Sequence, residues 1–252
     1  RRRCRSRAAR RSPAARSAPQ LPEPIVREIA SGTSRIAHRY DNVTVLQADM
    51  CGFTKLSSER SAEIVLGMLS DLFARFDALT EMHGVHKVKT IGDAYVVCCG
   101  AFDETPSVSE AARRVAAMGL SMLKAVRHTA DEEGEDINVR IGVHTGTAIG
   151  GIIGTERFHF DMWGRALVGA VIMEEMGERG RIHVSDKTAS LLQSAFELEQ
   201  SPLTGTESTL ANFGTIGSSY FVERAAEERG AEDTWRGSPP RDAALSPPPL
   251  GS

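Results

Sequence analysis

The sequence predicts an α+β fold, a ferredoxin-like βαββαβ sandwich with one sheet, helices packed on one face, and additional C-terminal strands and helices. Two observations support this prediction. Segments of extended and helical character follow one another in the order β-α-β-β-α-β along the 252 residues. The composition, with 41% hydrophobic and 25% charged residues, is that of an ordinary globular chain, and the longest apolar runs are far shorter than the roughly 20 residues of a membrane-spanning helix.

The first expected strand covers residues 43–48, a β-branched and apolar run that leads directly into Asp49. The first expected helix covers residues 58–82, because its apolar side chains recur at helical spacing and form one face. Ser58 is the expected N-cap of this helix, and Gly84 is its expected end. The apolar face is formed by Val65, Leu69, Leu72, Phe73, Phe76 and Leu79.

Two strands and a second helix are expected next. Residues 86–91 and 94–99 are extended runs joined at a tight turn through Gly92 and Asp93, which predicts a hairpin. A helical pattern over residues 108–130 follows it. These elements complete the β-α-β-β-α part of the expected fold.

The second half of the chain predicts another hairpin, over residues 138–144 and 147–153, with Thr145 and Gly146 at its turn. This hairpin supplies the last strand of the sandwich. The remaining expected elements are a helix over residues 165–177, a strand over 181–185, a short helix over 186–193 and a last strand over 220–223.

The folded part is expected to be one domain over residues 21–224. Residues 1–20 hold eight arginines and no acidic residue, which predicts a disordered basic arm; an arm that binds RNA, anionic lipid or an import receptor is the alternative. Residues 225–252 are rich in proline and are predicted to be a disordered tail. Residues 21–252 carry 22 basic and 33 acidic side chains, a net charge of −11, which argues against a nucleic-acid partner for the fold itself.

The cysteines indicate the compartment. Cys4, Cys51, Cys98 and Cys99 form neither a CxxC pair nor a zinc-binding spacing. Reduced thiols in a cytoplasmic domain are therefore expected. Because the chain begins with Arg1 rather than Met, we expect a fragment, and any membrane attachment would lie in segments outside this chain.

Two aspartates are the first candidates for chemistry. Asp49 follows a buried strand and Asp93 lies in a tight turn, and the predicted sheet order brings their strands side by side. Neighbouring carboxylates repel unless a cation lies between them, and hard oxygen ligands suit Mg²⁺ shared with substrate phosphates. The alternative is structural, with Asp49 as a turn cap and Asp93 as a stabiliser of its hairpin, and either residue taken alone favours it.

The segment after Asp49 is a candidate phosphate-binding loop. Gly52, Phe53 and Thr54 precede a helix, so their backbone N–H groups can reach phosphate oxygens, and Thr54 adds a hydroxyl. A strand, an aspartate, a glycine and a helix in this order are common among α/β proteins, so this loop alone is weak support for phosphate binding.

Arg140 lies in the middle of a largely apolar strand and needs an anionic partner there. A nucleotide phosphate would satisfy it. A structural ion pair with Asp136 or Glu135 would satisfy it equally well, so the residue itself leaves both interpretations open.

Four blocks of sequence resemble a known family. They are ADMCGFT at residues 48–54, KVKTIGDAY at 87–95, RIGVHTG at 140–146 and FDMWG at 160–164. In this order they are similar to successive blocks of the class III nucleotidyl cyclase catalytic domain, and the resemblance covers residues 21–224. Members of that family make a cyclic nucleotide from a nucleoside triphosphate, as dimers with active sites shared between two catalytic domains.

The resemblance implies roles for the matched residues. Asp49 and Asp93 resemble the two catalytic aspartates that bind two Mg²⁺ ions, with Mn²⁺ as a substitute, and Met50 belongs to the same metal-binding block. The backbone from Met50 to Thr54 resembles the triphosphate loop. Arg140 resembles the catalytic arginine that contacts a phosphate.

Lys89 and Asp161 match the pair that, in this family, reads the purine base across the dimer interface. Adenine presents an acceptor at N1 and a donor at N6, which a lysine and a carboxylate complement, whereas guanine reverses both groups. Guanylyl cyclases typically carry Glu and Cys at these positions, so the chain resembles an adenylyl cyclase. The structural alternatives are a solvated strand residue for Lys89 and a turn cap for Asp161.

The chain departs from the family where other groups stabilise the transition state. The family has an Asn seven residues and an Arg eleven residues beyond the purine-reading Asp, where this chain has Val168 and Ile172. Arg165 lies nearby, and residues 212–217 contain no lysine where the family often has one for phosphate. Like the segment 181–185, this pattern resembles the first, metal-binding half of mammalian transmembrane adenylyl cyclases.

The predicted function is an adenylyl cyclase domain that converts ATP into cyclic AMP and pyrophosphate with two metal ions. It is expected to work as a homodimer or, more favourably for activity, as a heterodimer with a second cyclase domain that supplies the missing groups. The alternatives are a cyclase-like regulatory or dimerisation module with little turnover, and a guanylyl cyclase.

Overall fold

The computed structural model describes residues 21–33, 36–102, 106–154, 159–202 and 218–225. Within these ranges the elements are α1 (Glu23–Ala30), β1 (Ala37–Cys51), α2 (Phe53–Glu59), α3 (Ala62–His83), β2 (His86–Ile91), β3 (Ala94–Cys99), α4 (Val108–Glu133), β4 (Asn138–Ile153), β5 (His159–Trp163), α5 (Arg165–Glu175), β6 (Ile182–Ser185), α6 (Asp186–Leu192), β7 (Phe196–Gln200) and β8 (Ser219–Ala225). The expected arm at 1–20, the tail beyond 225 and the segment 212–217 lie outside the described residues.

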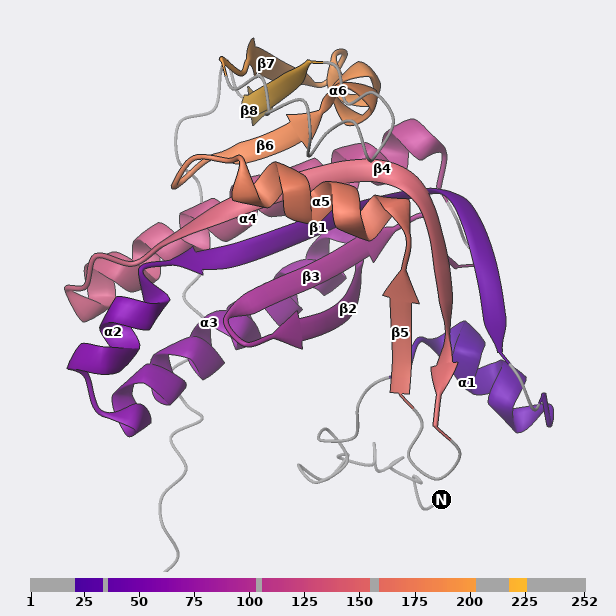
Figure 1. Cartoon of the computed structure of the whole chain (residues 1–252), viewed down its shortest axis with the longest axis horizontal. Coiled ribbons are helices and arrows are strands. Elements are labelled where there is room, and N and C mark those ends of the chain that lie inside the picture. The colour runs from indigo at the N-terminus through magenta and orange to yellow at the C-terminus, as the bar shows by residue number, and fades with distance from the viewer. Residues whose placement is uncertain (1–20, 34–35, 103–105, 155–158, 203–217, 226–252) are drawn as a thin grey trace, which may run out of the picture.

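One mixed sheet forms the centre of the molecule (Figure 1), with the strand order β2-β3-β1-β4-β6-β8-β7 and with β5 paired to β4. The long strand β1 is central and antiparallel to both β3 and β4. Strand β6 runs parallel to β4 and leads the C-terminal strands away from β1. The α+β class predicted from the sequence is confirmed.

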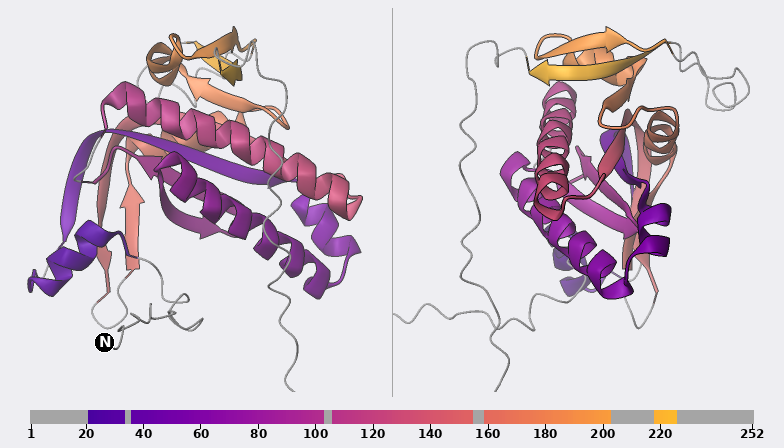
Figure 2. Two further views of the ribbon diagram at one scale, coloured as in Figure 1. Left: turned by 180° about the vertical axis from the view of Figure 1, so that it is seen from behind. Right: turned by 90° about the vertical axis from the view of Figure 1, so that its left-hand side faces the viewer.

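Helices cover both faces of this sheet, so the expectation that they pack on one face was wrong. α3, α4 and α6 pack over a core that includes Leu46 and Tyr95, and Figure 2 (left) shows α3 and α4 lying across this face. α1 and α5 cover the opposite face, over Val45 and Cys98, and α5 crosses the front of the sheet in Figure 1.

Small residues let α5 approach the sheet closely. A Cβ atom added to Gly142 of β4 would lie 2.1 Å from the backbone nitrogen of Glu174 in α5. A Cβ atom on Gly169 of α5 would lie 2.2 Å from the ring of His144. Because such distances are impossible for real atoms, these glycines fix the helix directly on β4.

Strand β4 is continuous, so the hairpin predicted around Thr145 and Gly146 was wrong. Both residues lie within the ladder and pair with Thr44 and Val43 of β1. A Cβ atom on Gly146 would lie 3.2 Å from the backbone nitrogen of Ala166. The glycine therefore serves the close approach of α5 rather than a turn.

The helix predicted over residues 58–82 is two helices, α2 and α3. Arg60 is extended between them, and the side chain of Ser61 accepts a hydrogen bond from the first turn of α3. Ser61 rather than Ser58 is thus the N-cap. Gly84 ends α3 as predicted, in the left-handed conformation with φ 62°.

The strands predicted over residues 86–91 and 94–99 are confirmed as β2 and β3. The sequence analysis missed α1, β5 and β7, and the last strand, β8, extends through Ala225. Among the described residues, no helix has both the length and the apolar character needed to cross a bilayer.

Candidate functional site

The sheet brings Asp49 and Asp93 together. Asp49 lies near the end of β1, and Asp93 lies in the turn between β2 and β3; the pairing of Ala48 with Tyr95 makes the end of β1 adjacent to that turn. Partial burial raises the pKa of Asp49, the nearby charge of Asp93 raises it further, and Arg140 lowers it. Two carboxylates that repel each other across adjacent strands form a fitting pair for a divalent cation.

The surroundings of this pair limit which groups complete a metal site. Among the described residues, no cluster of three or more His, Cys, Asp and Glu side chains is placed to hold an ion. The side chain of Met50 is buried in the core, 4% exposed, so only its main chain can face a metal. Magnesium commonly takes one or two carboxylates together with substrate phosphates, and the residues present fit that pattern.

The loop between β1 and α2 carries the predicted phosphate-binding residues. Gly52 has φ 83°, a left-handed conformation that disfavours side chains, and its carbonyl accepts from Leu56 N–H at 3.0 Å. Phe53 and Thr54 are the first residues of α2, where backbone N–H groups have no partner within the helix. The ring of Phe53 packs against the core, so any contact of this residue with a phosphate comes from its backbone.

Arg140 takes part in an ion pair that the sequence analysis did not foresee. On β4 it pairs in register with Asp49 of β1. Its Nε donates to Oε1 of Glu174 at 2.9 Å, and its terminal nitrogen lies 2.9 Å from the same oxygen. That terminal nitrogen lies 3.7 Å from Oδ2 of Asp49. The guanidinium therefore lies between two carboxylates and closer to Glu174.

Asp136 and Glu135, the structural partners expected for Arg140, bind other arginines instead. Asp136 bonds to Arg179, with one contact at 3.0 Å, and Glu135 forms an ion pair with Arg60. Glu174 lies on α5, 34 residues away from Arg140 in sequence, and no local pattern connects the two. Only the packing of α5 on β4 reveals the partner.

Glu174 is a buried acid, 3% exposed. Burial raises the pKa of its carboxyl group, Arg140 lowers it, and Asp49 raises it. A buried carboxylate is favourable only where a cation and hydrogen bonds compensate for lost hydration. Arg140 supplies both, which makes Glu174 part of the candidate site.

Lys89 and Asp161 lie in direct contact. Lys89 Nζ donates to the two carboxylate oxygens of Asp161 at 2.7 and 3.0 Å, from β2 to β5. Their side chains are 20% and 14% exposed, so Lys89 is not a fully solvated strand residue. The backbone N–H of Met162 also donates to Asp161, at 2.7 Å. The structure therefore joins the two predicted purine-reading residues into one donor–acceptor pair.

Val168 and Ile172 have different environments although both lie on α5. Val168 is 39% exposed, whereas Ile172 is 5% exposed. The two positions, four residues apart on α5, therefore differ in their access to solvent. Arg165 is the exposed first residue of α5.

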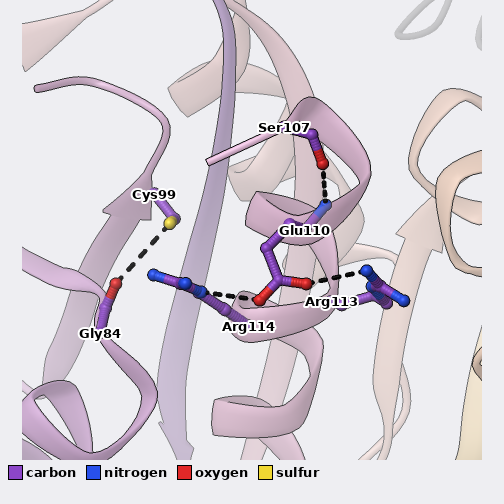
Figure 3. Close-up of polar contacts among 6 residues, drawn as sticks. All are labelled: Gly84, Cys99, Ser107, Glu110, Arg113 and Arg114. Atoms are coloured by element: carbon purple, nitrogen blue, oxygen red, sulfur yellow. Dashed lines mark hydrogen bonds and ion pairs between the residues drawn. The ribbon is translucent and has the colours of Figure 1, made fainter. Parts of the chain in front are cut away.

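A separate cavity of about 690 Å³ lies between the end of α3, the start of α4 and strands β7 and β8. Figure 3 shows its polar groups, in which the carboxylate of Glu110 bonds to Arg113 and Arg114 at 2.9 Å each. Both arginines lower the pKa of Glu110. None of the predicted site residues lines this cavity, so it is distinct from the candidate site.

Comparisons of this chain with known proteins all point to the same family. The profile of the "Adenylate and Guanylate cyclase catalytic domain" matches residues 36–211. Adenylate cyclase type 9 of Xenopus laevis is 40% identical over 163 residues, which is 65% of this chain and 12% of that protein. A membrane guanylyl cyclase of Dictyostelium discoideum is 33% identical over 182 residues, 72% of this chain and 12% of its own length.

A solved structure agrees with these matches. The guanylate cyclase domain of RhGC from Catenaria anguillulae, in complex with GTP, has a TM-score of 0.65 and 31% identity, and the match covers 75% of this chain and 99% of that one. This chain spans only about an eighth of the length of the curated relatives. Adenylyl and guanylyl enzymes both appear among the similar proteins.

Proposed function

The chain belongs to the adenylate and guanylate cyclase catalytic domain family, and we propose that within this family it is an adenylyl cyclase domain that converts ATP into cyclic AMP and pyrophosphate. The contact between Lys89 and Asp161 is the observation that carries this choice. A lysine donor and a carboxylate acceptor lie side by side, 2.7 Å apart, and they are the types of group that the N1 acceptor and the N6 donor of adenine need. Guanine would place its own donor against the lysine and its own acceptor against the carboxylate. Each group left unsatisfied in this way would cost about 1–3 kcal/mol of binding free energy.

The proposed reaction is an internal displacement. The ribose 3′ oxygen bonds to the α-phosphorus and loses its proton, while the bond from that phosphorus to the bridging oxygen of the β-phosphate breaks and pyrophosphate leaves. When held by Asp49, Asp93 and the main chain at Met50, two Mg²⁺ ions, or Mn²⁺ in their place, activate the hydroxyl and neutralise the leaving phosphates. Arg140 contributes positive charge toward the same phosphates.

The backbone around Gly52 provides a second set of phosphate contacts in this proposal. The N–H groups of Phe53 and Thr54 lie directly after the strand end that carries Asp49. Nucleotide phosphates next to that strand end would then contact Arg140 and the loop, and would share bound metal ions with the carboxylate pair. Positioning and neutralisation of charge are the main contributions expected from the protein.

A second cyclase domain completes the proposed active site. Neither Val168 nor Ile172 donates a hydrogen bond from its side chain, so the groups expected at the ribose and the transition state have to come from a partner. Ile149 and Trp163 form a cross-strand pair between β4 and β5 and are 53% and 43% exposed. This apolar pair, with Val168 on α5, supports a dimer of cyclase domains. We propose that this dimer lies in the cytoplasm and that any attachment to a membrane comes from segments outside this chain.

The test is a cyclase assay on the purified domain, with ATP or GTP and with Mg²⁺ or Mn²⁺. We expect cyclic AMP from a mixture of this chain with a partner domain that carries the Asn and the Arg. The homodimer should be at least about 10²-fold slower, because it lacks these transition-state groups. Faster turnover of GTP than of ATP by the homodimer, in which Lys89 and Asp161 read the base at both sites, would overturn the adenylyl assignment.

A nucleotide-binding module without turnover is the second candidate, and the apolar residues at positions 168 and 172 favour it. Binding of ATP in calorimetry, together with no product from any mixture of cyclase domains, would support this function instead.

A further inference from the structure

We propose that Glu174 is a positioning residue that holds Arg140 away from Asp49, so that Asp49 stays available to a divalent cation and Arg140 to a phosphate. This inference rests on the proposed function only in that the substrate is a nucleoside triphosphate with a metal ion. It applies equally to ATP and GTP, and it assigns a task to a residue that the motifs do not include.

The distances define which carboxylate holds the guanidinium. Glu174 Oε1 accepts from Nε of Arg140 at 2.9 Å and lies 2.9 Å from a terminal nitrogen. Asp49 Oδ2 lies 3.7 Å from that nitrogen, beyond normal hydrogen-bond length. A guanidinium has five N–H donors in a fixed fork, so the edge occupied by Glu174 leaves the far side free for another acceptor.

Burial makes Glu174 the fixed member of this trio. Its side chain is 4% exposed, whereas the side chains of Arg140 and Asp49 are 35% and 30% exposed. Its backbone is also closely packed, because Gly142 lets α5 lie directly against β4 at this residue. The guanidinium is thus anchored from the protein interior, and its outer edge and Asp49 face solvent.

Removing the anchor changes what Arg140 can reach. Without the carboxylate of Glu174, the remaining acid paired in register with Arg140 is Asp49. The guanidinium would then close the 3.7 Å gap and form a direct ion pair with Asp49. That ion pair competes with a cation for the same oxygens, so cation affinity should fall although no ligand has been altered.

The experiment measures Mn²⁺ binding to the purified chain without nucleotide, by the electron paramagnetic resonance signal of the free ion. Glu174→Gln removes the charge and keeps the size, and Glu174→Asp keeps the charge but withdraws the carboxylate from Arg140. We expect affinity to fall about tenfold for E174Q and at least threefold for E174D. Glu175→Gln, at an exposed neighbouring position on α5, is the matched control and should bind within twofold of the unaltered chain.

A second substitution separates positioning from the simple effect of charge. Arg140→Gln added to E174D should restore Mn²⁺ affinity at least to that of the unaltered chain, because the competitor for Asp49 is then absent. Circular dichroism identifies variants that fail to fold, and E174D remains the decisive variant if E174Q is one of them. Wild-type affinity in E174D, or E174D/R140Q as weak as E174D, would overturn the proposal. A chain that binds Mn²⁺ in this pattern but cyclises GTP would instead refute only the adenylyl assignment.

Discussion

Lys89 Nζ lies 2.7 and 3.0 Å from the two carboxylate oxygens of Asp161, 72 residues later in the chain. Each residue satisfies the other before any nucleotide is present. A purine that binds here has to offer both a donor and an acceptor in exchange, because a buried polar group left unpaired is costly. In the chain without nucleotide, Lys89 and Asp161 are therefore bonded to each other, and a base has to replace this bond in order to bind to them.

Changing this pair should change the base. Lys89→Glu together with Asp161→Cys should lower the preference for ATP over GTP by about 10²-fold, since both hydrogen-bonding groups are reversed or removed. The measurement is the ratio of cyclic AMP to cyclic GMP formed by the homodimer, in which this pair reads the base at both sites. An unchanged ratio would mean that other residues select the base.

Metal-dependent turnover should require both aspartates. Asp93→Ala or Asp49→Ala should reduce the rate at saturating Mg²⁺ by at least about 10²-fold, while Asp71→Ala, an exposed change on α3, should have little effect. Asp93→Ala should not lower thermal stability, because it removes a like charge near Asp49. Near-full activity of either active-site variant would contradict the assignment of Asp49 and Asp93 as metal ligands.

Grafting the family residues onto α5 should succeed at one position only. Val168→Asn should be tolerated at a side chain that is 39% exposed, whereas Ile172→Arg places a charge at one that is 5% exposed. We expect I172R to destabilise the fold by at least about 3 kcal/mol, as measured by thermal unfolding. Val168→Arg is the matched control, and equal stability of the two arginine variants would contradict the buried environment of Ile172.

Stability should fall as the pH drops from about 6.5 toward 4, partly because of His144. Burial is the main cause that lowers the pKa of this histidine, from 6.5 to about 4. Between these values the unfolded chain binds a proton that the folded chain does not, so its contribution is complete above pH 6.5 and is lost as pH falls. His144→Gln should flatten this dependence in denaturant unfolding at pH 7 and pH 5.

An exposed histidine provides the comparison for that measurement. His159, on the exposed side of β5, is the matched position, and the unfolding of His159→Gln is measured at the same two pH values. An identical loss of stability in H144Q and the unaltered chain would show that other groups dominate this pH range.

The parts of the site that the sequence predicts are those encoded by short segments. Asp93 could be placed in its turn because β2 and β3 pair across Gly92 and Asp93 alone, and Asp49 could be placed near the end of its strand because an apolar run leads directly into it. Glu174 could not be predicted, since its partner is reached only when α5 packs on β4. The same long-range packing explains why a turn was wrongly predicted at Thr145 and Gly146. In the sequence, a glycine that makes room for α5 cannot be distinguished from one that reverses the chain.

Because β4 is one continuous strand, it carries residues of two distant parts of the molecule. Arg140 lies near one end of the strand and Ile149 nine residues further along it, a span of about 30 Å at the usual rise per residue. The strand bends along its length (Figure 1), and between these two residues its pairing with β1 shifts register. The exposed Ile149 and the guanidinium of Arg140 are thus joined by one unbroken strand, with no loop between them.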